Sequence, residues 1–262
     1  MNEIFAERGD GSVHREGDTV RRPLHPWSGA VHALLAHLGS VGFAAAPRVL
    51  AVDGDTEVLT FLPGESGADG WAKVVDEDGL RAAARLLRSY HDAVRTWRPA
   101  DAETLVWADG STGVGAPRAA GADEQIVCHG DFGSWNLVWN GLDPVGLPDW
   151  EYAHVAPALS DVAYALEYVA PFRSDDEAMR WQRYPSPPDR RRRIAIFAEA
   201  YGWPGTDGLV DAVAGEQRRG RALVQALAER GVARQVAMVA EGYLDELDER
   251  IAWTSAHRQL LE

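Results

Sequence analysis

The segment of residues 127–161 concentrates polar side chains that could do chemistry. Asp131 is followed five residues later by Asn136, and Asp149 comes after two short apolar runs. These runs predict a two-strand ribbon, which would place Asn136 and Asp149 at neighbouring edges and Asp131 on the loop before it. We therefore expect three oxygen-bearing side chains to converge on one point.

This set of oxygen ligands favours a magnesium ion and phosphoryl transfer. Asn136 and Asp149 would leave most coordination positions open, which suits Mg²⁺ because it keeps water and substrate phosphates as ligands. Zinc would require histidine and cysteine. In phosphoryl transfer the protein mainly positions the reactants and neutralises charge, with an aspartate base on a loop near the metal-binding asparagine. Asp131 is the predicted base.

Composition restricts the class of protein. The formal net charge of −14 over 262 residues argues against nucleic-acid binding, which needs clustered Lys and Arg. The chain has no apolar run long enough to span a bilayer, and its acidic, polar start is unlike a secretory signal. We expect a cytoplasmic protein without a membrane partner. The single cysteine, Cys128, excludes an intrachain disulfide, and composition leaves the oligomeric state undetermined.

The order of expected elements divides the chain into two lobes. Residues 13–22 are typical of a hairpin, a helix follows with Ser28 as its N-cap, and two β-rich runs surround the turn at residues 53–55. The remainder is mainly helical in pattern. We expect an N-terminal lobe of residues 1–62 and a helical C-terminal lobe of residues 63–262.

A family resemblance emerges from the polar segment. The motif H-G-D-x-x-x-x-N, from His129 to Asn136, is followed by "PDWEYAHVAPALSDVAYAL". This pattern resembles the aminoglycoside phosphotransferase family, which is similar to protein and choline kinases. The resemblance implies a bilobal, protein-kinase-like α/β (α+β) fold with a reduced N-terminal lobe. It also implies an enzyme that uses ATP and Mg²⁺ to phosphorylate a hydroxyl group of a small molecule.

The resemblance assigns roles around the motif. Asp131 would take or orient the proton of the substrate hydroxyl, while Asn136 and Asp149 would bind the Mg²⁺ that bridges the nucleotide phosphates. The supporting residues would be three in number: His129, Glu151 and Asp161. His129 would brace the loop. Asp161 would support the loop from the next helix or act as an N-cap-like residue, and Glu151 would lie near the substrate or cover a surface turn.

The N-terminal lobe departs from the family pattern. Family members contact the phosphates through a strand lysine, but Lys73 is the only lysine here, so Arg21 or Arg22 must substitute. A strand points only one of the two toward the cleft, and we favour Arg21. The helix after Pro26 lacks the acidic partner found in the family, and His32 stands near its expected place.

The hinge between the lobes is predicted just before Pro63. The backbone groups of Thr60, Phe61 and Leu62 would meet the adenine, although the same run is compatible with an ordinary buried strand. The expected acceptor is an aminoglycoside-like antibiotic or amino sugar. The alternatives are a metabolic choline, sugar or nucleoside kinase, and a nucleotide-binding protein without turnover.

Two further patterns are predicted to be structural. The run of residues 190–193, four arginines at a helix start, is expected to form a solvated helical face. His91 and Asp92 lie side by side on an amphipathic helix, where such a pair is more often structural than catalytic.

Overall fold

The N-terminal part of the chain is a small antiparallel sheet over one helix. The computed structural model describes residues 13–115 and 124–262. Within these residues the sheet has the strand order β1-β2-β4-β3. Its two hairpins turn at Gly17 and Gly54, both with φ of 59°, a left-handed conformation that favours glycine. The strands are β1 (His14–Glu16), β2 (Thr19–Pro23), β3 (Val49–Asp53) and β4 (Thr56–Thr60). The expected hairpins are confirmed.

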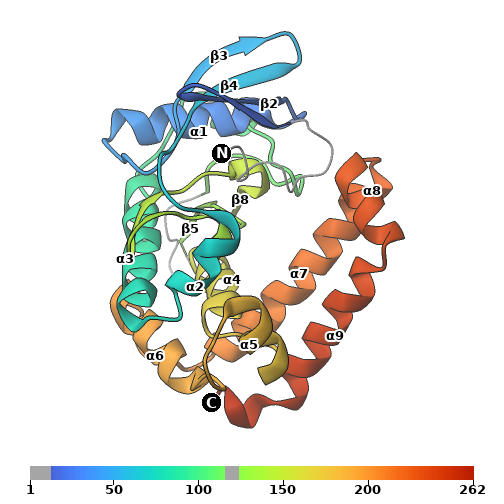
Figure 1. The fold of residues 1–262 in the computed structure, drawn as a ribbon. Coiled ribbons are helices and arrows are strands. Elements are labelled where there is room, and N and C mark those ends of the chain that lie inside the picture. Colours follow the sequence, from blue (N-terminus) through green and yellow to red (C-terminus); the bar gives the residue numbers. More distant parts are fainter. Residues whose placement is uncertain (1–12, 116–123) are drawn as a thin grey trace.

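Helix α1 (Ser28–Ser40) lies beneath this sheet in Figure 1. Its apolar residues Leu34, Leu35 and Leu38 are almost fully buried, so burial of this face holds the helix in place. The start of the helix differs from the prediction by one residue. Trp27 is the N-cap and Ser28 is the first helical residue. The Ser28 hydroxyl accepts a hydrogen bond from the backbone N–H of His25 at 2.9 Å.

We call the four-stranded sheet with α1 the sheet lobe. Short two-stranded ribbons connect it to the remaining helices. The strands pair antiparallel as β5 with β8 and β6 with β7. Their bounds are β5 (Gln125–Cys128), β6 (Val138–Asn140), β7 (Asp143–Gly146) and β8 (His154–Pro157). The second strand of the β6–β7 ribbon therefore ends before Asp149 rather than at it. Asp149 lies three residues beyond the strand, in a turn of its own.

Helices make up most of the rest of the chain. Helix α3 (Glu77–Val94) begins at its N-cap Asp76, which accepts from the N–H of Asp78, and packs against α6 and β5. Figure 1 shows α7 and α9 running side by side, with α8 at their upper end. The other helices are α2 (Gly70–Lys73), α4 (Leu159–Val169), α5 (Asp175–Gln182), α6 (Arg190–Tyr201), α7 (Leu209–Glu229), α8 (Ala233–Ala240) and α9 (Tyr243–Ala256).

The arginine run at the start of α6 is solvated at Arg191 and Arg192 but not at the other two positions. Arg190 and Arg193 are 4% and 6% exposed, and their guanidinium groups donate to backbone carbonyls of the preceding segments. Arg190 donates to the carbonyl of Pro171 at 2.8 Å and Arg193 to that of Val169 at 2.7 Å. The prediction was wrong for these two residues because orphan carbonyls at the end of α4 need donors.

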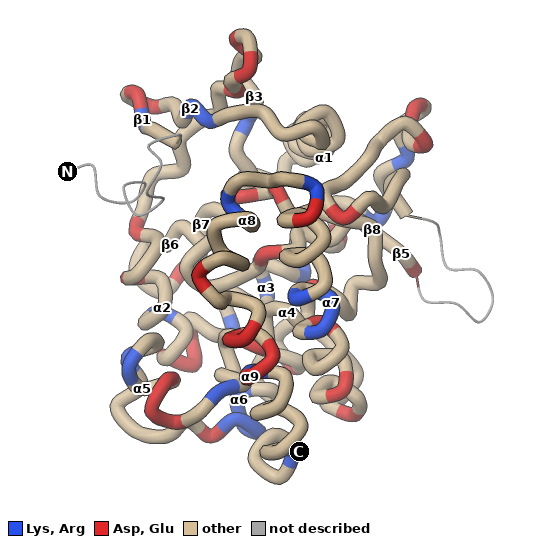
Figure 2. The backbone as a smooth tube through the Cα atoms, turned by 90° about the vertical axis from the view of Figure 1, so that its right-hand side faces the viewer, with Lys and Arg blue, Asp and Glu red and all other residues tan. Residues whose placement is uncertain are grey.

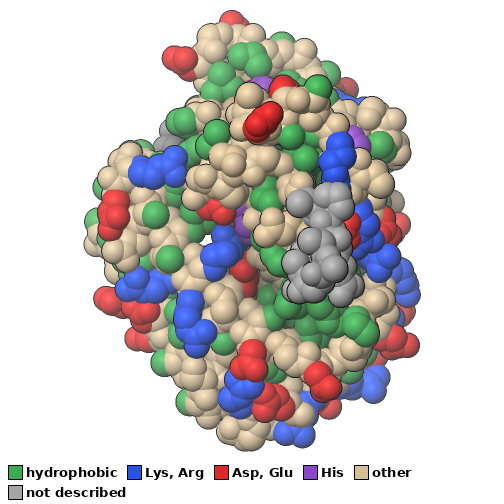
Figure 3. Space-filling model, turned by 180° about the vertical axis from the view of Figure 1, so that it is seen from behind, with side chains coloured by type: hydrophobic (Ala, Val, Ile, Leu, Met, Phe, Trp, Pro, Cys, Tyr) green, Lys and Arg blue, Asp and Glu red, His purple; other side chains and the backbone are tan. Residues whose placement is uncertain are grey.

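The charges of the surface are mixed in sign. Acidic and basic residues are interspersed along the helices in Figure 2, and the face seen in Figure 3 shows the same intermingling. Among the described residues, the helices are all too short or too polar to cross a bilayer. The boundary expected between residues 62 and 63 falls just after β4, and the division into two lobes at that point stays a prediction.

Candidate active site

The loop after β5 is fixed by a buried carboxylate. Asp161, on α4, is fully buried, and its two oxygens accept from the backbone N–H groups of His129 at 2.6 Å and Gly130 at 2.8 Å. A Cβ at Gly130 would approach the carbonyl oxygen of Tyr152 to 2.0 Å. Glycine is therefore required between the histidine and the aspartate of the motif.

Asp161 is held in its ionised form. Burial alone would raise its pKa, but hydrogen bonds from His91 and the loop backbone keep the pKa well below the usual range. His91 lies 3.0 Å from the carboxylate through Nε2 and contacts the hydroxyl of Tyr201 through Nδ1. Of the two roles left open for Asp161, this geometry favours support of the loop.

His129 ties the loop to the segment before Asp149. Its Nε2 lies 2.9 Å from the carbonyl oxygen of Pro148, and its Nδ1 accepts from the backbone N–H of Asp131 at 3.2 Å. These contacts assign a neutral ring with the proton on Nε2. Burial lowers the pKa of His129, which favours the same neutral form.

Asp131 is held at both carboxylate oxygens. Asn136 donates to Oδ2 at 2.6 Å, and the hydroxyl of Tyr164 donates to Oδ1. Burial raises the pKa of Asp131 to about 7, even though the hydrogen bonds from Tyr164 and Asn136 lower it. A carboxylate with a pKa near neutrality is well suited to accept a proton at physiological pH.

Tyr164 is a site residue that the sequence reasoning missed. It lies three residues after Asp161 on α4, and residues at this spacing share one face of a helix. Asp161 was already a candidate for loop support. The helical spacing from Asp161 to Tyr164 could therefore have identified the tyrosine.

Asn136 and Asp149 remain the two predicted oxygen ligands of a metal ion. Asn136 uses its Nδ2 for Asp131, so its side-chain oxygen remains to act as a ligand. Asp149 has a left-handed backbone with φ of 59°, an uncommon conformation for a residue with a side chain. Among the described residues, His, Cys, Asp and Glu form no cluster of three or more that could hold a metal. An amide oxygen and a carboxylate fit a magnesium ion that takes its other ligands from phosphates and water.

The arginine that reaches this site is Arg22 rather than the favoured Arg21. Arg22 is 6% exposed, and its Nη1 lies 3.4 Å from Oδ1 of Asp149. Arg21 pairs instead with the exposed Asp53 at 3.0 Å. The sequence indicated correctly that only one of the two adjacent arginines faces the loop. It did not show which one, because that depends on which face of β2 packs toward the loop.

A second missed residue, Glu57, supplies the acidic partner that α1 lacks. Glu57 lies directly opposite Arg22 in the β2–β4 register and is 1% exposed. It accepts from Nε of Arg22 through one oxygen and contacts Nε2 of His32 through the other. Burial would lower the pKa of Arg22, but the charges of Glu57 and Asp149 raise it, so the guanidinium remains charged.

The predicted hinge residues are the last residue of β4, Thr60, and the two residues that follow it. The N–H of Thr60 donates to the carbonyl of Arg48 at 2.9 Å, and that of Phe61 to Asp18 at 2.8 Å. Within the described part of the chain no carbonyl accepts from the N–H of Leu62. Of the three predicted hinge residues, Leu62 is therefore the one whose backbone donor has no backbone acceptor among the described residues.

Glu151 does not cover a surface turn. It is 9% exposed, and its carboxylate pairs with Arg234 at 3.0 Å and His25 at 3.3 Å. These contacts connect the segment after Asp149 to α8 and to the turn between β2 and α1.

A cavity of about 280 Å³ opens beside Asp131, and we call it the loop cavity. Rings of Trp135, Tyr164 and Tyr168 form one wall, with Trp135 and Tyr168 4.5 Å apart at their centroids. Carboxylates and guanidinium groups both line it. Its other charged residues are Glu167, Glu216, Arg219, Arg234 and Arg250.

The fold is shared with solved small-molecule kinases. A spectinomycin phosphotransferase in complex with ADP and spectinomycin is similar with a TM-score of 0.60 and 10% identity, covering 96% of this chain and 91% of that one. An amicoumacin kinase bound to AMP-PNP and Ca²⁺ gives 0.56 and 10%, covering 91% and 84%. An ethanolamine kinase of Plasmodium vivax gives 0.54 and 12%, covering 92% and 77%. The expected kinase-like bilobal fold is confirmed.

The sequence comparisons agree with the fold. Residues 113–197 match the phosphotransferase enzyme family. The trifolitoxin immunity protein of Rhizobium leguminosarum bv. trifolii is 33% identical over 208 residues, which are 77% of this chain and 75% of that protein. The chain belongs to the phosphotransferase enzyme family.

Proposed function

We propose that this protein transfers the γ-phosphoryl group of ATP, with Mg²⁺, to a hydroxyl group of an antibiotic-like small molecule. The observation that carries the proposal is the placement of Asp131. Its carboxylate is held by Asn136 and Tyr164 at the edge of the loop cavity. An acceptor bound in that cavity would present its hydroxyl to a fixed base.

The proposed chemical step begins with Asp131. Its carboxylate accepts the proton of the acceptor hydroxyl, whose oxygen forms a bond to the γ-phosphorus of ATP while the bond to the bridging oxygen breaks and ADP leaves. The neutral-range pKa of Asp131 provides the unprotonated carboxylate at and above pH 7. Tyr164 and Asn136 keep the carboxylate oriented, which avoids the cost of ordering it during reaction.

The nucleotide is assigned to the side of the site that holds Arg22. Arg22 would contact a phosphate, Glu57 would hold the guanidinium in place, and the N–H of Leu62 would contact the adenine. The side chains of Asn136 and Asp149 would bind Mg²⁺, which neutralises phosphate charge when present. His129 and Asp161 would keep Asp131 in register with these groups.

The acceptor is proposed to be an antibiotic-type compound, and an aminoglycoside or amino sugar is one candidate. Support comes from the relative that is named as an immunity protein and from kinases of spectinomycin and amicoumacin with the same fold. The loop cavity adds a restriction. Its carboxylates stand beside arginines, with Glu216 2.5 Å from Arg219, so a polycation gains less attraction there than in a purely acidic pocket.

A metabolic alcohol kinase is the second candidate. The wall of Trp135, Tyr164 and Tyr168 could bind an ammonium group through cation–π contacts, and an ethanolamine kinase shares the fold. The non-catalytic alternative rested on a missing lysine, a missing helix carboxylate and a short Gly-rich region. The Arg22–Glu57 pair would supply the first two charges. The Gly-rich region before residue 13 lies outside the described residues.

The proposal is tested by measuring ADP release from Mg-ATP with a panel of hydroxyl compounds. The panel contains aminoglycosides, amino sugars, choline and ethanolamine, and hydroxyl compounds that carry a carboxylate. We expect acceptor-dependent ADP release and a product heavier by one phosphoryl group in mass spectrometry. Nucleotide binding without acceptor-dependent release over the whole panel would contradict the proposal.

A further inference from the structure

A second cavity adjoins the loop cavity between α5 and α9. It has a volume of about 750 Å³, and we call it the α5–α9 cavity. Arg250 lines both cavities. The aromatic wall also continues from one to the other, since Trp135 of the loop cavity stacks on Trp71 of the α5–α9 cavity with centroids 4.6 Å apart. A ligand held beside Asp131 could therefore extend into this second space.

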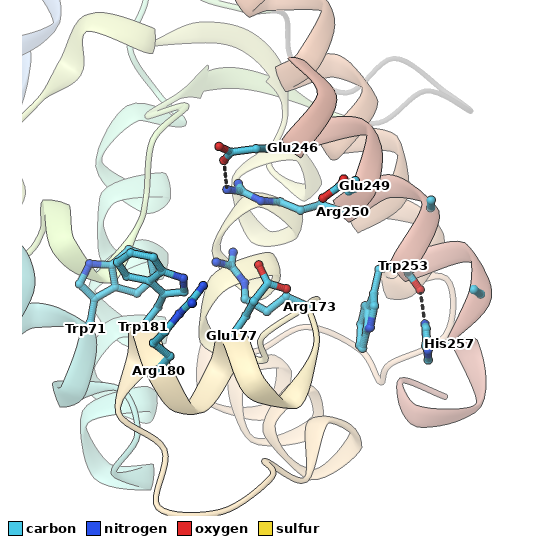
Figure 4. A pocket seen from close by; sticks show the side chains of 12 residues that line it. Trp71, Arg173, Glu177, Arg180, Trp181, Glu246, Glu249, Arg250, Trp253 and His257 are labelled. Carbon is cyan, nitrogen blue, oxygen red and sulfur yellow. Dashed lines mark hydrogen bonds and ion pairs between the residues drawn. The ribbon is translucent and has the colours of Figure 1, made fainter. Parts of the chain in front are cut away.

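Arg173 is the unusual residue of the α5–α9 cavity. It is 4% exposed, yet among the described residues its Nε and Nη2 have no hydrogen-bond acceptor. Its guanidinium lies 5.1 Å from the ring of Tyr168. Figure 4 shows Arg173 and Arg250 reaching into the same space from different elements. A buried charged donor without an acceptor is costly and needs an explanation.

The two unpartnered nitrogens form one edge of the guanidinium. That edge carries two parallel N–H groups, which match the two oxygens of a carboxylate. The protein uses this edge in the same way elsewhere: Nε and Nη2 of Arg192 donate to the two oxygens of Glu77 at 2.6 and 2.8 Å. Arg221 and Asp248 repeat the arrangement at 2.6 and 2.9 Å. Only at Arg173, among these three arginines, does the protein supply no carboxylate.

The backbone around Arg173 is held in place. Nη2 of Arg190 donates to the carbonyl oxygen of Arg173 at 2.7 Å, and Ser174 begins α5 with a capping box that includes Glu177. Glu167 interacts electrostatically with Arg173 and Arg250, but it does not accept from the unpartnered edge. The backbone that carries Arg173 is therefore held in place before any ligand binds, which reduces the entropy lost on binding.

We propose that the Nε–Nη2 edge of Arg173 binds a carboxylate on the acceptor molecule, at a distance from the hydroxyl that is phosphorylated. Tryptophans surround this position: Trp71 and Trp253 line the cavity, and Trp181, 57% exposed, lies on its rim. The acceptor class is thus a hydroxyl compound with an apolar or aromatic arm that ends in a carboxylate. This inference rests on the proposed function for the identity of the ligand, but the site can be tested by binding alone.

The binding test compares indole-3-acetate with indole-3-acetamide, which have the same ring and differ in charge. Calorimetry on the full chain should show the acid binding about tenfold or more tightly than the amide, as expected for a bidentate charged contact. Equal affinities, or no binding of either compound at millimolar concentration, would overturn the inference. ATP should not displace the acid, and displacement would assign the edge to a nucleotide phosphate instead.

Variants locate the contact. Arg173→Met should abolish the preference for the acid, and Arg173→Lys, which keeps the charge but loses the fork, should retain only part of it. Arg180→Met is the matched control because Arg180 lines the same cavity from an exposed position, and it should leave the preference unchanged. A preference that survives Arg173→Met in folded protein would contradict the inference. Thermal unfolding shows whether each variant is folded. The comparison of indole-3-acetate with indole-3-acetamide on the wild-type protein tests the inference even if a variant does not fold.

Turnover separates this inference from the proposed function. Hydroxyl compounds that the enzyme phosphorylates are compared as free acids and primary amides. We expect a KM about tenfold lower for the acids. Turnover with equal KM values would overturn the carboxylate site and support the phosphotransferase activity. Carboxylate binding without turnover of any acceptor would contradict the phosphotransferase activity and support the carboxylate site.

Discussion

The loop after β5 and the sheet lobe hold their functional groups in different ways. In the loop, Asp131, Asn136 and Asp149 come from one continuous segment, and Asp161 fixes the backbone from the helix that follows it. In the sheet lobe, the charged cluster needs three separate elements, because Arg22 is on β2, Glu57 on β4 and His32 on α1. A continuous segment reveals its chemistry by order and spacing, whereas an assembled cluster does so only after folding.

The largest expected effect comes from substituting Asp131 in the loop after β5. Asp131→Asn removes the proposed base and should lower kcat by about a thousandfold, within the range for loss of a general base. Steady-state ADP release measures it. Asp143→Asn, an exposed aspartate on β7, is the control and should retain wild-type activity. Activity of the Asp131 variant close to wild type would remove the base assignment.

Asp161→Asn tests whether the loop depends on a buried carboxylate. The change leaves a backbone donor of the loop unpaired and should lower the free energy of unfolding by about 2–4 kcal/mol, measured by urea denaturation at pH 7. The exposed Asp92→Asn should cost well under about 1 kcal/mol.

The pH dependence of this effect has a definite sign. The pKa of Asp161 is depressed in the folded protein, so its contribution is present above the unfolded pKa of about 4 and is lost as the pH falls below that value. The difference in stability between wild type and Asp161→Asn should therefore shrink in acid. A difference that does not change between pH 7 and pH 3 would show that the ionised carboxylate is not what stabilises the loop.

The sheet side is tested by two adjacent arginines. Arg22→Met should raise the KM for ATP by about tenfold or more, because a charged contact to phosphate is lost. Arg21→Met should change this KM by less than about twofold, since the Arg21 side chain forms a surface ion pair with the exposed Asp53. The reverse order would return the phosphate contact to Arg21.

The smallest effect is a shift in a pH profile. The hydrogen bond from Tyr164 lowers the pKa of Asp131, so Tyr164→Phe should move the acid limb of kcat/KM to higher pH by roughly one pH unit. Tyr168→Phe alters the same cavity without touching Asp131 and should leave the position of that limb unchanged. An unshifted limb in the Tyr164 variant would mean that the limb does not report Asp131.

The sequence pointed to the groups of the loop because they lie in one segment, and their roles stay predictions. Order and spacing pointed to Asp131, Asn136 and Asp149, and the hairpins and helices were evident from turns and periodicity. Tyr164 could have been found by helical spacing from Asp161. Glu57 could not, because its role depends on the register of β4 against β2. The same limit applies to Arg22 and Arg21, since pattern alone does not show which face of β2 turns inward.

The central claim is that the chain moves a phosphoryl group from ATP to a hydroxyl, and single-turnover transfer from γ-labelled ATP tests it most directly. Excess enzyme is mixed with labelled Mg-ATP and an acceptor from the panel, and the products are separated. We predict that the label appears in the acceptor as a phosphate monoester, and that Asp131→Asn binds ATP with similar affinity but does not transfer the label. Label that remains in ATP, or appears only as inorganic phosphate with every acceptor, would contradict the account.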